Sequence, residues 1–346
     1  MEKKSPQPKT APRSKWKSAL IFLLTSLGLV LALSFLGARQ FLTTPVQPQR
    51  TTTRFVIPSG ENLTGIALQL KEQELISNAF FFGLYARYQG AAASLQAGEY
   101  LFDAPHTPVE ILSILKKGKV KLYRITLPEG LNMKETAAVV DRSGFCDKTD
   151  FLRLCTDADF IRELGIASHS LEGYLYPDTY FFPITADCRQ IISKMVESLD
   201  RVYGNEWKKR GTELGFNRQE VLTLASIIEK ETGKAFERPL ISSVFHNRIH
   251  KGMKLQSDPT VIYGDPNFKG RIRTRHLRRK TPYNTYVIKG LPLGPIANPG
   301  AAAIEAALYP DKSDFLFFVS KNDRTHKFSK TLKEHNRAVR KYQLNR

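Results

Sequence analysis

RFVIPSGEN at residues 54–62 and RITLPEGLN at residues 124–132 share one pattern, 70 residues apart. Each copy has a short run rich in β-branched and aromatic residues, then a Pro-x-Gly turn, and then an Asn, which favours a helix N-cap. After the first copy, Leu63, Ile66 and Leu70 are spaced as on one face of a helix. The sequence therefore predicts two small α+β units that each begin with a strand, a turn and a helix.

The repeat continues beyond these segments, with Phe81 matching Phe151 and Leu84 matching Leu154. The first copy resembles the opening of LysM modules, which bind glycans that contain N-acetylglucosamine. The alternative is a small packing unit without a ligand, because a fold does not dictate a function. We expect a LysM-like unit over residues 54–122, with a strand at 98–102 and a helix at 109–117, and a second repeat-like unit over residues 123–165.

An uncharged stretch lies near the N-terminus, SALIFLLTSLGLVLALSFLGA at residues 18–38. It is as long as the roughly 20 residues that cross a bilayer, so it predicts a transmembrane helix. Six Lys and Arg residues precede the stretch and few follow it closely, so the positive-inside rule places residues 1–17 in the cytoplasm. The alternative is a cleaved signal peptide, whose apolar region is shorter. Both predict that the later residues, after a linker at 39–53, lie outside the cytoplasm.

The chain is strongly basic, with 52 Lys and Arg against 33 Asp and Glu, a net charge of +19. The excess is concentrated in residues 1–50, 265–280 and 321–346. A basic patch suits nucleic acid, anionic lipid or another acidic polymer. An extracytoplasmic location argues against nucleic acid as a partner and leaves the membrane and acidic polymers of the cell envelope.

Several kinds of catalytic site are not supported by the motifs present. There is no GxSxG, no Gly-rich phosphate loop and no HExxH. The three cysteines are too few for a thiolate zinc site, and their pairing stays open. The two histidines of HNRIH (246–250) have metal-ligand spacing but no acidic neighbour, so we interpret this segment as a solvated basic helix. The sequence thus predicts neither a metal nor a cofactor.

The most regular later segment is QEVLTLASIIEKET at 219–232, which predicts a helix that stops near Gly233. Its apolar residues form one stripe that is expected to be buried. The residues expected on the opposite, solvent face are Thr223, Ser226 and Lys230. Glu229 and Glu231 fall on the two edges of the stripe. Glu231 is nearer the helix C-terminus, whose partial negative charge raises a carboxyl pKa, as a general acid requires. The alternative, which the residues alone favour, is that both are ordinary solvated glutamates that pair with Lys230, Lys234 or Arg238.

Loops rich in aromatic, amide and hydroxyl side chains surround this helix in the sequence. They read LEGYLYPDTY (171–180), LQSDPTVIY (255–263), PYNTY (282–286) and LPLGPIANPG (291–300). Such side chains suit sugar rings and their hydroxyl pairs. The alternative is that Pro and Gly fix turns and the tyrosines pack.

Six motifs in order resemble the YceG-like endolytic murein transglycosylases (MltG). They are EGYLYPDTY (172–180), ASIIEKET (225–232), LQSDPTVIYG (255–264), TPYNTY (281–286), GLPLGPIANPG (290–300) and HKFSKTLKEHN (326–336). The resemblance implies a single-pass inner-membrane enzyme that cuts nascent glycan strands between N-acetylmuramic acid and N-acetylglucosamine. The cut leaves 1,6-anhydromuramic ends and limits strand elongation. The resemblance also suggests peptidoglycan synthases as partners.

The resemblance places the catalytic glutamate at Glu231, the second Glu of EKE, and gives Glu229 a supporting place in the substrate site. The residues expected to hold the sugar and stabilise developing charge are Gln256, Asp258, Thr260, Tyr263, Tyr283, Asn284 and Tyr286. Two other functions stay open, a non-catalytic glycan-binding scaffold and a hydrolytic muramidase. The expected architecture is α+β: a transmembrane helix, the LysM-like unit, and a mixed α/β catalytic domain over 123–346 with a helical core, a strand at 315–319 and a basic helix from Leu332.

Overall fold

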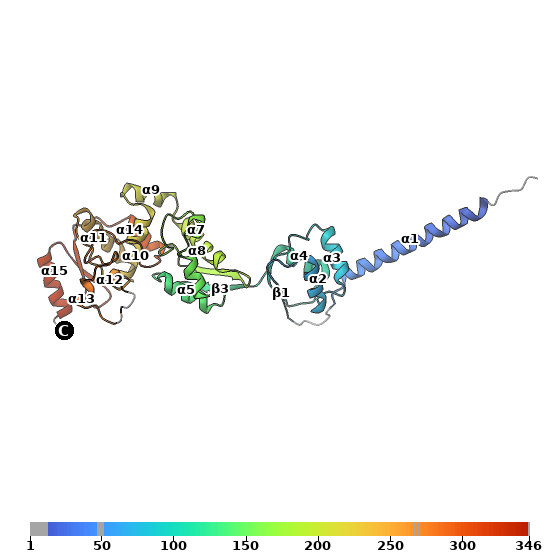
Figure 1. The fold of residues 1–346 in the computed structure, drawn as a ribbon, viewed down its shortest axis with the longest axis horizontal. Helices are drawn as coiled ribbons and strands as arrows, with labels where there is room; N and C mark the ends of the chain where they lie inside the picture. The colour runs from blue at the N-terminus through green and yellow to red at the C-terminus, as the bar shows by residue number, and fades with distance from the viewer. Residues whose placement is uncertain (1–12, 47–51, 264, 266–267, 269, 345–346) are drawn as a thin grey trace, which may run out of the picture. The chain divides into compact units, whose positions relative to one another are not determined.

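The computed structural model describes residues 13–46, 52–263, 265, 268 and 270–344, which form two compact units (Figure 1). Unit 1 extends to Leu122 and includes 183–185, and unit 2 comprises 123–182 and the chain from Ala186 onward. Each unit has its own hydrophobic core. Helices combine with three two-stranded sheets in the described residues, so the predicted α+β class is confirmed.

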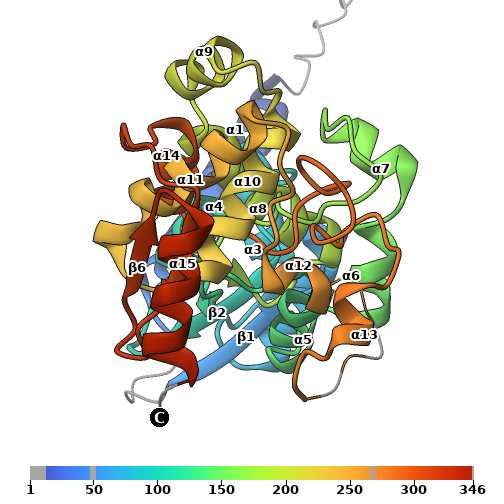
Figure 2. The same ribbon diagram turned by 90° about the vertical axis from the view of Figure 1, so that its left-hand side faces the viewer.

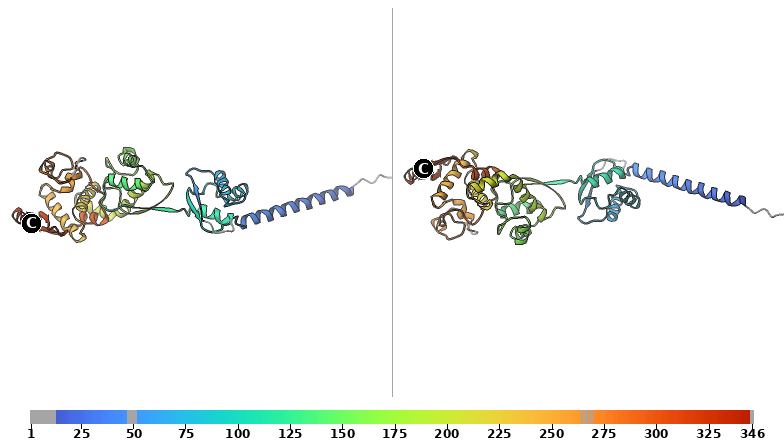
Figure 3. Two further views of the ribbon diagram at one scale, coloured as in Figure 1. Left: turned by 90° about the horizontal axis from the view of Figure 1, so that it is seen from below. Right: turned by 90° about the horizontal axis from the view of Figure 1, so that it is seen from above.

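Helix α1 (Arg13–Thr43) contains the predicted apolar span and is drawn as one continuous helix in Figure 3. Its stretch Ala19–Thr43 is long and apolar enough to cross a membrane. The helix continues past Ala38 through residues predicted as linker, because no Gly or Pro interrupts them and Phe41 packs against the core of unit 1. Residues 1–12 and 47–51, parts of the predicted tail and linker, lie outside the described residues.

The rest of unit 1 is a two-stranded sheet covered by helices. Its elements are β1 (Thr53–Ile57), α2 (Leu63–Glu72), α3 (Ala79–Tyr88), β2 (Gly98–Phe102) and α4 (Pro108–Lys117). Strands β1 and β2 pair antiparallel, with Phe55 opposite Tyr100. In β1 the buried residues alternate, as expected for a sheet with one face on the core, whereas in β2 every residue except Leu101 is buried.

The two repeat segments fold as predicted at their start. Strand β1 leads into α2, and strand β3 (Leu122–Thr126) leads into α5 (Met133–Arg142). Asn62 caps α2 by accepting from the Gly65 N–H, and Asn132 caps α5 by accepting from the Glu135 N–H. Each copy therefore begins with strand, turn and capped helix, and the predicted pattern is confirmed.

Unit 2 is mainly helical. The elements that follow α5 are α6 (Lys148–Leu154), α7 (Ala158–Glu163), β4 (Thr179–Pro183), α8 (Cys188–Val202), α9 (Asn205–Glu213), α10 (Arg218–Glu231), a 3₁₀ turn η1 (Ala235–Glu237), α11 (Arg238–His250), α12 (Asp258–Tyr263), α13 (Thr274–Leu277), α14 (Ala301–Leu308), β5 (Phe317–Ser320), β6 (His326–Ser329), α15 (Leu332–Val339) and a π-helical turn η2 (Arg340–Leu344). Strand β3 pairs with β4, and β5 pairs antiparallel with β6. Figure 2 shows α15 beside β6. Helix α15 is the C-terminal helix that was predicted from Leu332 onward.

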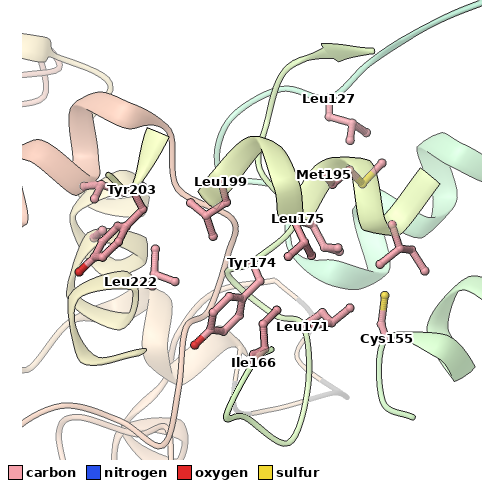
Figure 4. Packing of buried hydrophobic residues seen from close by; sticks show 14 of the residues in the cluster. Leu127, Cys155, Ile166, Leu171, Tyr174, Leu175, Met195, Leu199, Tyr203 and Leu222 are labelled. Atoms are coloured by element: carbon pink, nitrogen blue, oxygen red, sulfur yellow. The ribbon is translucent and has the colours of Figure 1, made fainter. Parts of the chain in front are cut away.

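The core of unit 2 brings together segments far apart in the sequence. Figure 4 shows Leu171 and Leu175 close to Met195 of α8, and Tyr203 near Leu222 of α10. A disulfide joins Cys146 to Cys188 across 42 residues, while Cys155 is a buried free thiol. The pairing that the sequence left open is therefore set by these contacts.

Residues 221–228 of helix α10 are buried, and the helix packs against α9, α11, α12 and α14. The predicted solvent face is therefore wrong for Thr223 and Ser226, which are buried. Their hydroxyls donate to the carbonyls of Gln219 and Thr223 in the same helix, so both fit an apolar setting. The helix ends at Glu231 because Thr232 adopts an extended backbone.

The interpretation of HNRIH as a solvated helix is also wrong, since His246 and Arg248 of α11 are buried. The His246 ring lies 2.8 Å from the Ala307 carbonyl, and Arg248 donates to the carbonyls of Leu255 and Leu316. These side chains hold neighbouring segments of chain together. Buried polar groups are tolerated because their hydrogen bonds are made.

Candidate active site

Glu231 is the last residue of α10 and faces the start of α12. The Ser257 hydroxyl donates to Glu231 Oε1 at 2.5 Å, although the two residues are 26 positions apart. The Glu231 residue keeps a small exposed area, whereas Ser257 is buried. A desolvated carboxyl group is thus held at the edge of the core, on a residue that is itself partly exposed.

The electrostatic setting of Glu231 favours its protonated form. Burial raises its pKa to about 7, and the Asp258 carboxylate adds to the rise. The Ser257 hydrogen bond and the Arg248 guanidinium lower the pKa and limit the shift. A carboxyl that titrates near neutral pH can both donate and recover a proton, as general acid–base catalysis requires.

The segment before α12 is fixed by a network centred on Thr285. The Gln256 N–H donates to the Thr285 carbonyl, and the Ser257 N–H donates to the Thr285 hydroxyl at 2.9 Å. The Thr260 hydroxyl donates to the Ser257 carbonyl and lies 2.8 Å from Thr285 Oγ1. Gln256 has φ of 51°, a left-handed conformation that is uncommon for non-glycine residues. These contacts aim Ser257 at Glu231 and leave the Gln256 side chain exposed.

Asp258 and Tyr286 join this group. The Tyr286 hydroxyl donates to Asp258 Oδ1 at 2.7 Å, and burial together with the Asp258 charge raises the Tyr286 pKa. Asp258 is exposed beside Ser257. The structure therefore brings Glu231, Gln256, Asp258, Thr260 and Tyr286 together, although they come from three separate segments.

Tyr263 and Tyr283 form a second group at the far end of α12. Their rings meet edge to face with centroids 4.8 Å apart. The Tyr263 hydroxyl donates to Glu172 Oε2 at 2.9 Å, and the Met133 N–H donates to the same carboxyl. Burial raises the Glu172 pKa to about 7. Both tyrosines are partly exposed, so their rings remain accessible.

Asn284 and Glu229 are engaged within the protein. The Asn284 amide donates to the carbonyls of three residues, His276, Leu277 and Arg279, and its oxygen accepts from the Tyr286 N–H. Glu229 pairs with Arg238 at 3.1 Å and accepts from the Gly300 N–H at 3.0 Å. Asn284 thus fixes the basic segment, and Glu229 fixes the loop before α14.

Three further residues of this region did not emerge from the sequence patterns as site residues. Ser257 lies inside a quoted motif, but only the fold shows that it faces Glu231. Arg248 was not recognised as a site residue because it lies among other basic residues. Glu172 was not recognised because it lies among aromatic residues. Contact with a distant carboxyl or backbone group distinguishes each of them, and no local pattern encodes such a contact. Within the described ranges, no three His, Cys, Asp or Glu side chains gather as a metal site requires.

The fold and the site agree with one class of protein. A model of the YceG-like family matches residues 55–341, which is most of the chain, so the chain belongs to this family and the resemblance is confirmed. An endolytic murein transglycosylase of Bacillus subtilis is 35% identical over 333 residues, and 91% of each chain is covered.

Two other similar proteins extend the comparison. An endolytic murein transglycosylase of Streptococcus pneumoniae (strain R6) is 28% identical, over 88% of this chain and 61% of its own. The crystal structure of a YceG-like protein from Listeria monocytogenes aligns with a TM-score of 0.58 at 34% identity, covering 84% of this chain and 99% of that one.

Proposed function

We propose that the chain is an endolytic lytic transglycosylase that cleaves the bond between N-acetylmuramic acid and N-acetylglucosamine, with Glu231 as its catalytic acid. The carrying observation is the desolvated Glu231 carboxyl, which lies at the edge of the core and is hydrogen-bonded by Ser257 at 2.5 Å. The names of the Bacillus and Streptococcus relatives support the same reaction. Membership of the YceG-like family makes a purely glycan-binding scaffold the weaker alternative.

One carboxyl group is enough for this reaction. Protonated Glu231 donates to the glycosidic oxygen as the bond from that oxygen to muramic C1 breaks. The resulting carboxylate takes the proton of the muramic C6 hydroxyl, whose oxygen forms a bond to C1. Glu231 ends protonated, and no water is consumed. A pKa near 7 suits both transfers because neither protonation state is strongly disfavoured.

The other site residues divide into two roles under this proposal. Gln256, Asp258, Tyr263, Tyr283 and Tyr286 expose polar atoms or ring faces and contact the sugars, with Asp258 stabilising positive charge that develops at C1. Thr260, Asn284 and Glu229 have their polar atoms occupied, so they position the loops that carry the contact residues. This narrows the expectation that seven residues hold the sugar, and it keeps the supporting place expected for Glu229.

A second candidate reaction is hydrolysis, and one observation favours it. Asp258 lies close enough to Glu231 to raise its pKa, and hydrolytic glycosidases use two carboxyl groups. In such an enzyme Asp258 would activate water or attack C1 directly. The Tyr286 hydrogen bond to Asp258 weakens its nucleophilicity, which favours the transglycosylase.

The proposal includes the surroundings of the catalytic unit. Helix α1 anchors the chain in the inner membrane with its N-terminus in the cytoplasm, so residues 54–346 lie on the outer side. Unit 1 is LysM-like in its β1-α2-α3-β2 order and holds glycan near the membrane. Cleavage of nascent strands limits their length, which places the enzyme beside peptidoglycan synthases. The exposed arginines at 271, 273, 275, 278 and 279 contact the carboxylates of peptide stems.

Reaction in water enriched in oxygen-18 tests the reaction class. The purified full chain in detergent is incubated with uncrosslinked glycan strands, and the products are weighed by mass spectrometry. Internal fragments that end in anhydromuramic acid and contain no oxygen-18 support the proposal. Reducing ends that carry one solvent oxygen assign hydrolysis instead, and strands bound but uncut assign the scaffold.

A further inference from the structure

Helix α3 of unit 1 is apolar on its outer face as well as its inner face. Phe82, Gly83 and Ala86 are buried against the unit 1 core. The apolar and aromatic residues that remain exposed are Phe80 (73%), Phe81 (46%), Leu84 (54%) and Tyr88 (85%), beside the exposed Arg87. Apolar residues on both faces of a helix are ordinarily covered on both sides. The exposed residues make a contiguous surface, which we call the α3 face, and such faces mark contact sites.

The two copies of the internal repeat can be compared at the positions that form the α3 face. The comparison shows that the fold does not require these apolar residues to be exposed. Phe81 and Leu84 correspond to Phe151 and Leu154 of the second copy. Phe151 and Leu154 are 0% and 8% exposed, because they face the unit 2 core. In unit 1 the same positions stay apolar although Phe81 and Leu84 remain about half exposed, with only the end of α1 beside them among the described residues. Core packing therefore accounts for the apolar residues at these positions in the second copy, but not in the first.

The α3 face is continuous with the end of the membrane span. The Phe41 ring of α1 lies 5.9 Å from the Phe81 ring, and Phe41 also packs against the unit 1 core. A groove joins the two helices, and its walls include Ala38, Phe41, Leu42, Phe81, Leu84 and Tyr88. Direct contacts within unit 1 thus fix the position of α3 along the axis of α1.

The length of the span places this groove at the surface of the bilayer. The apolar stretch Ala19–Thr43 has 25 residues. About 20 residues cross the hydrocarbon core, so the last turn, from Ala38 onward, lies among the headgroups. Aromatic side chains concentrate at that depth in membrane proteins. Helix α3 has no acidic residue and one basic residue, Arg87, as contact with an anionic leaflet requires.

We propose that the α3 face inserts into the interfacial layer of the membrane that α1 spans, and so holds unit 1 against the bilayer. This rests on the membrane anchoring proposed above, and it adds a second attachment site. Insertion restricts the tilt of unit 1 about the end of α1. The lipid is the occupant because the groove between α3 and the end of α1 is lined by apolar and aromatic side chains, so the face continues the apolar surface of the span.

Spin labels on the full chain in nanodiscs of phosphatidylethanolamine and phosphatidylglycerol test this proposal. Single cysteines are introduced as Phe80→Cys, Tyr88→Cys, Leu31→Cys in the span and Leu101→Cys in β2. Leu101 is 45% exposed, and Figure 1 shows its partner strand β1 on the side of unit 1 away from α1. The thiol-reactive spin label attaches to the introduced cysteine of each variant. The native cysteines do not react, because Cys155 is buried and the other two form a disulfide.

Collision of each label with oxygen and with a water-soluble nickel chelate reports its depth. We expect the oxygen-to-nickel ratio at residues 80 and 88 to exceed that at residue 101 several-fold and to fall below that at residue 31. A low oxygen-to-nickel ratio at residues 80 and 88, as for a label in water, together with a high ratio at residue 31, as for a label in lipid, would overturn the α3 proposal. The membrane anchor would remain supported. An aqueous ratio at 31 would overturn both. Spin–spin broadening at 80 that vanishes on dilution with unlabelled chain would assign the face to a second copy.

Discussion

Ser257 Oγ donates to Glu231 Oε1 at 2.5 Å, and this contact joins the end of the central helix to the loop before α12. It has two consequences for the carboxyl group. It fixes one oxygen in space, and it lowers a pKa that burial and Asp258 raise. The acidity and the aim of Glu231 therefore depend on a residue outside its own helix.

Replacing Ser257 by Ala changes both properties. Loss of the donor stabilises the protonated carboxyl, so the Glu231 pKa rises and the high-pH limb of kcat/KM moves to higher pH. The carboxyl also loses its fixed orientation, and we expect kcat to fall about 10-fold at the pH optimum. The pH profile of strand cleavage measures both effects, with Ser94→Ala in unit 1 as the matched control. An unmoved limb in Ser257→Ala would contradict the assigned interaction.

Glu229 forms a nearly buried ion pair with Arg238. Its partner Arg238 is also almost buried, so Glu229→Gln leaves a cation without its main partner. We expect a loss of about 3 kcal/mol in the free energy of unfolding. The double variant Glu229→Gln with Arg238→Met should lose less than the sum of the single variants. Denaturant unfolding of all four proteins measures this coupling, and additive losses would show that the pair is not coupled.

Glu172 makes the stability of unit 2 depend on pH. Its folded pKa of about 7 is raised above the ordinary value near 4.3, so folding favours the protonated form. The resulting stabilisation is complete below the ordinary pKa and is lost as the pH rises through about 7. Glu172→Gln has no proton to lose there. Between pH 5.5 and pH 8.5 the parent should lose on the order of 2 kcal/mol more than the variant. Equal losses in thermal or denaturant unfolding would contradict the assigned pKa.

The Cys146–Cys188 disulfide stabilises unit 2 through its unfolded state. It closes a loop of 42 residues, for which the chain-entropy relation gives about 4 kcal/mol. The variant with both cysteines replaced by Ser should unfold at correspondingly lower denaturant. Reduction of the parent with dithiothreitol should give the same midpoint as the variant. A parent midpoint unaffected by complete reduction would contradict the prediction.

Local sequence signals predicted the parts of the fold that local interactions determine. Asn62 and Asn132 bond N–H groups three residues away, so the repeat pattern carried its own caps. The apolar N-terminal helix was visible because length and composition alone define it. Helical periodicity did not separate Glu231 from Glu229, and the assignment of Glu231 came from the resemblance to the YceG-like family.

Long-range contacts determined what the sequence did not predict. Ser226 seemed solvent-exposed because its hydroxyl is polar, yet it bonds within the helix and accepts from the Ile296 N–H across 70 residues. Arg248 seemed a surface charge until the carbonyls of Leu255 and Leu316 were placed around it. Three cysteines permit three pairings, and only packing selects one. Each of these depends on the arrangement of whole elements.

Glu231→Gln tests the central claim most directly. Glu305→Gln is the matched control, because Glu305 is exposed on α14, the helix that packs against α10. The full-length parent and both variants are incubated with uncrosslinked glycan strands, and circular dichroism confirms that all three are folded. Mass spectrometry should find anhydromuramic-ended fragments from the parent and from Glu305→Gln, and a loss of at least about 1,000-fold in Glu231→Gln. Anhydro-ended fragments formed by Glu231→Gln at the parent's rate would contradict the assignment of Glu231 as the catalytic acid.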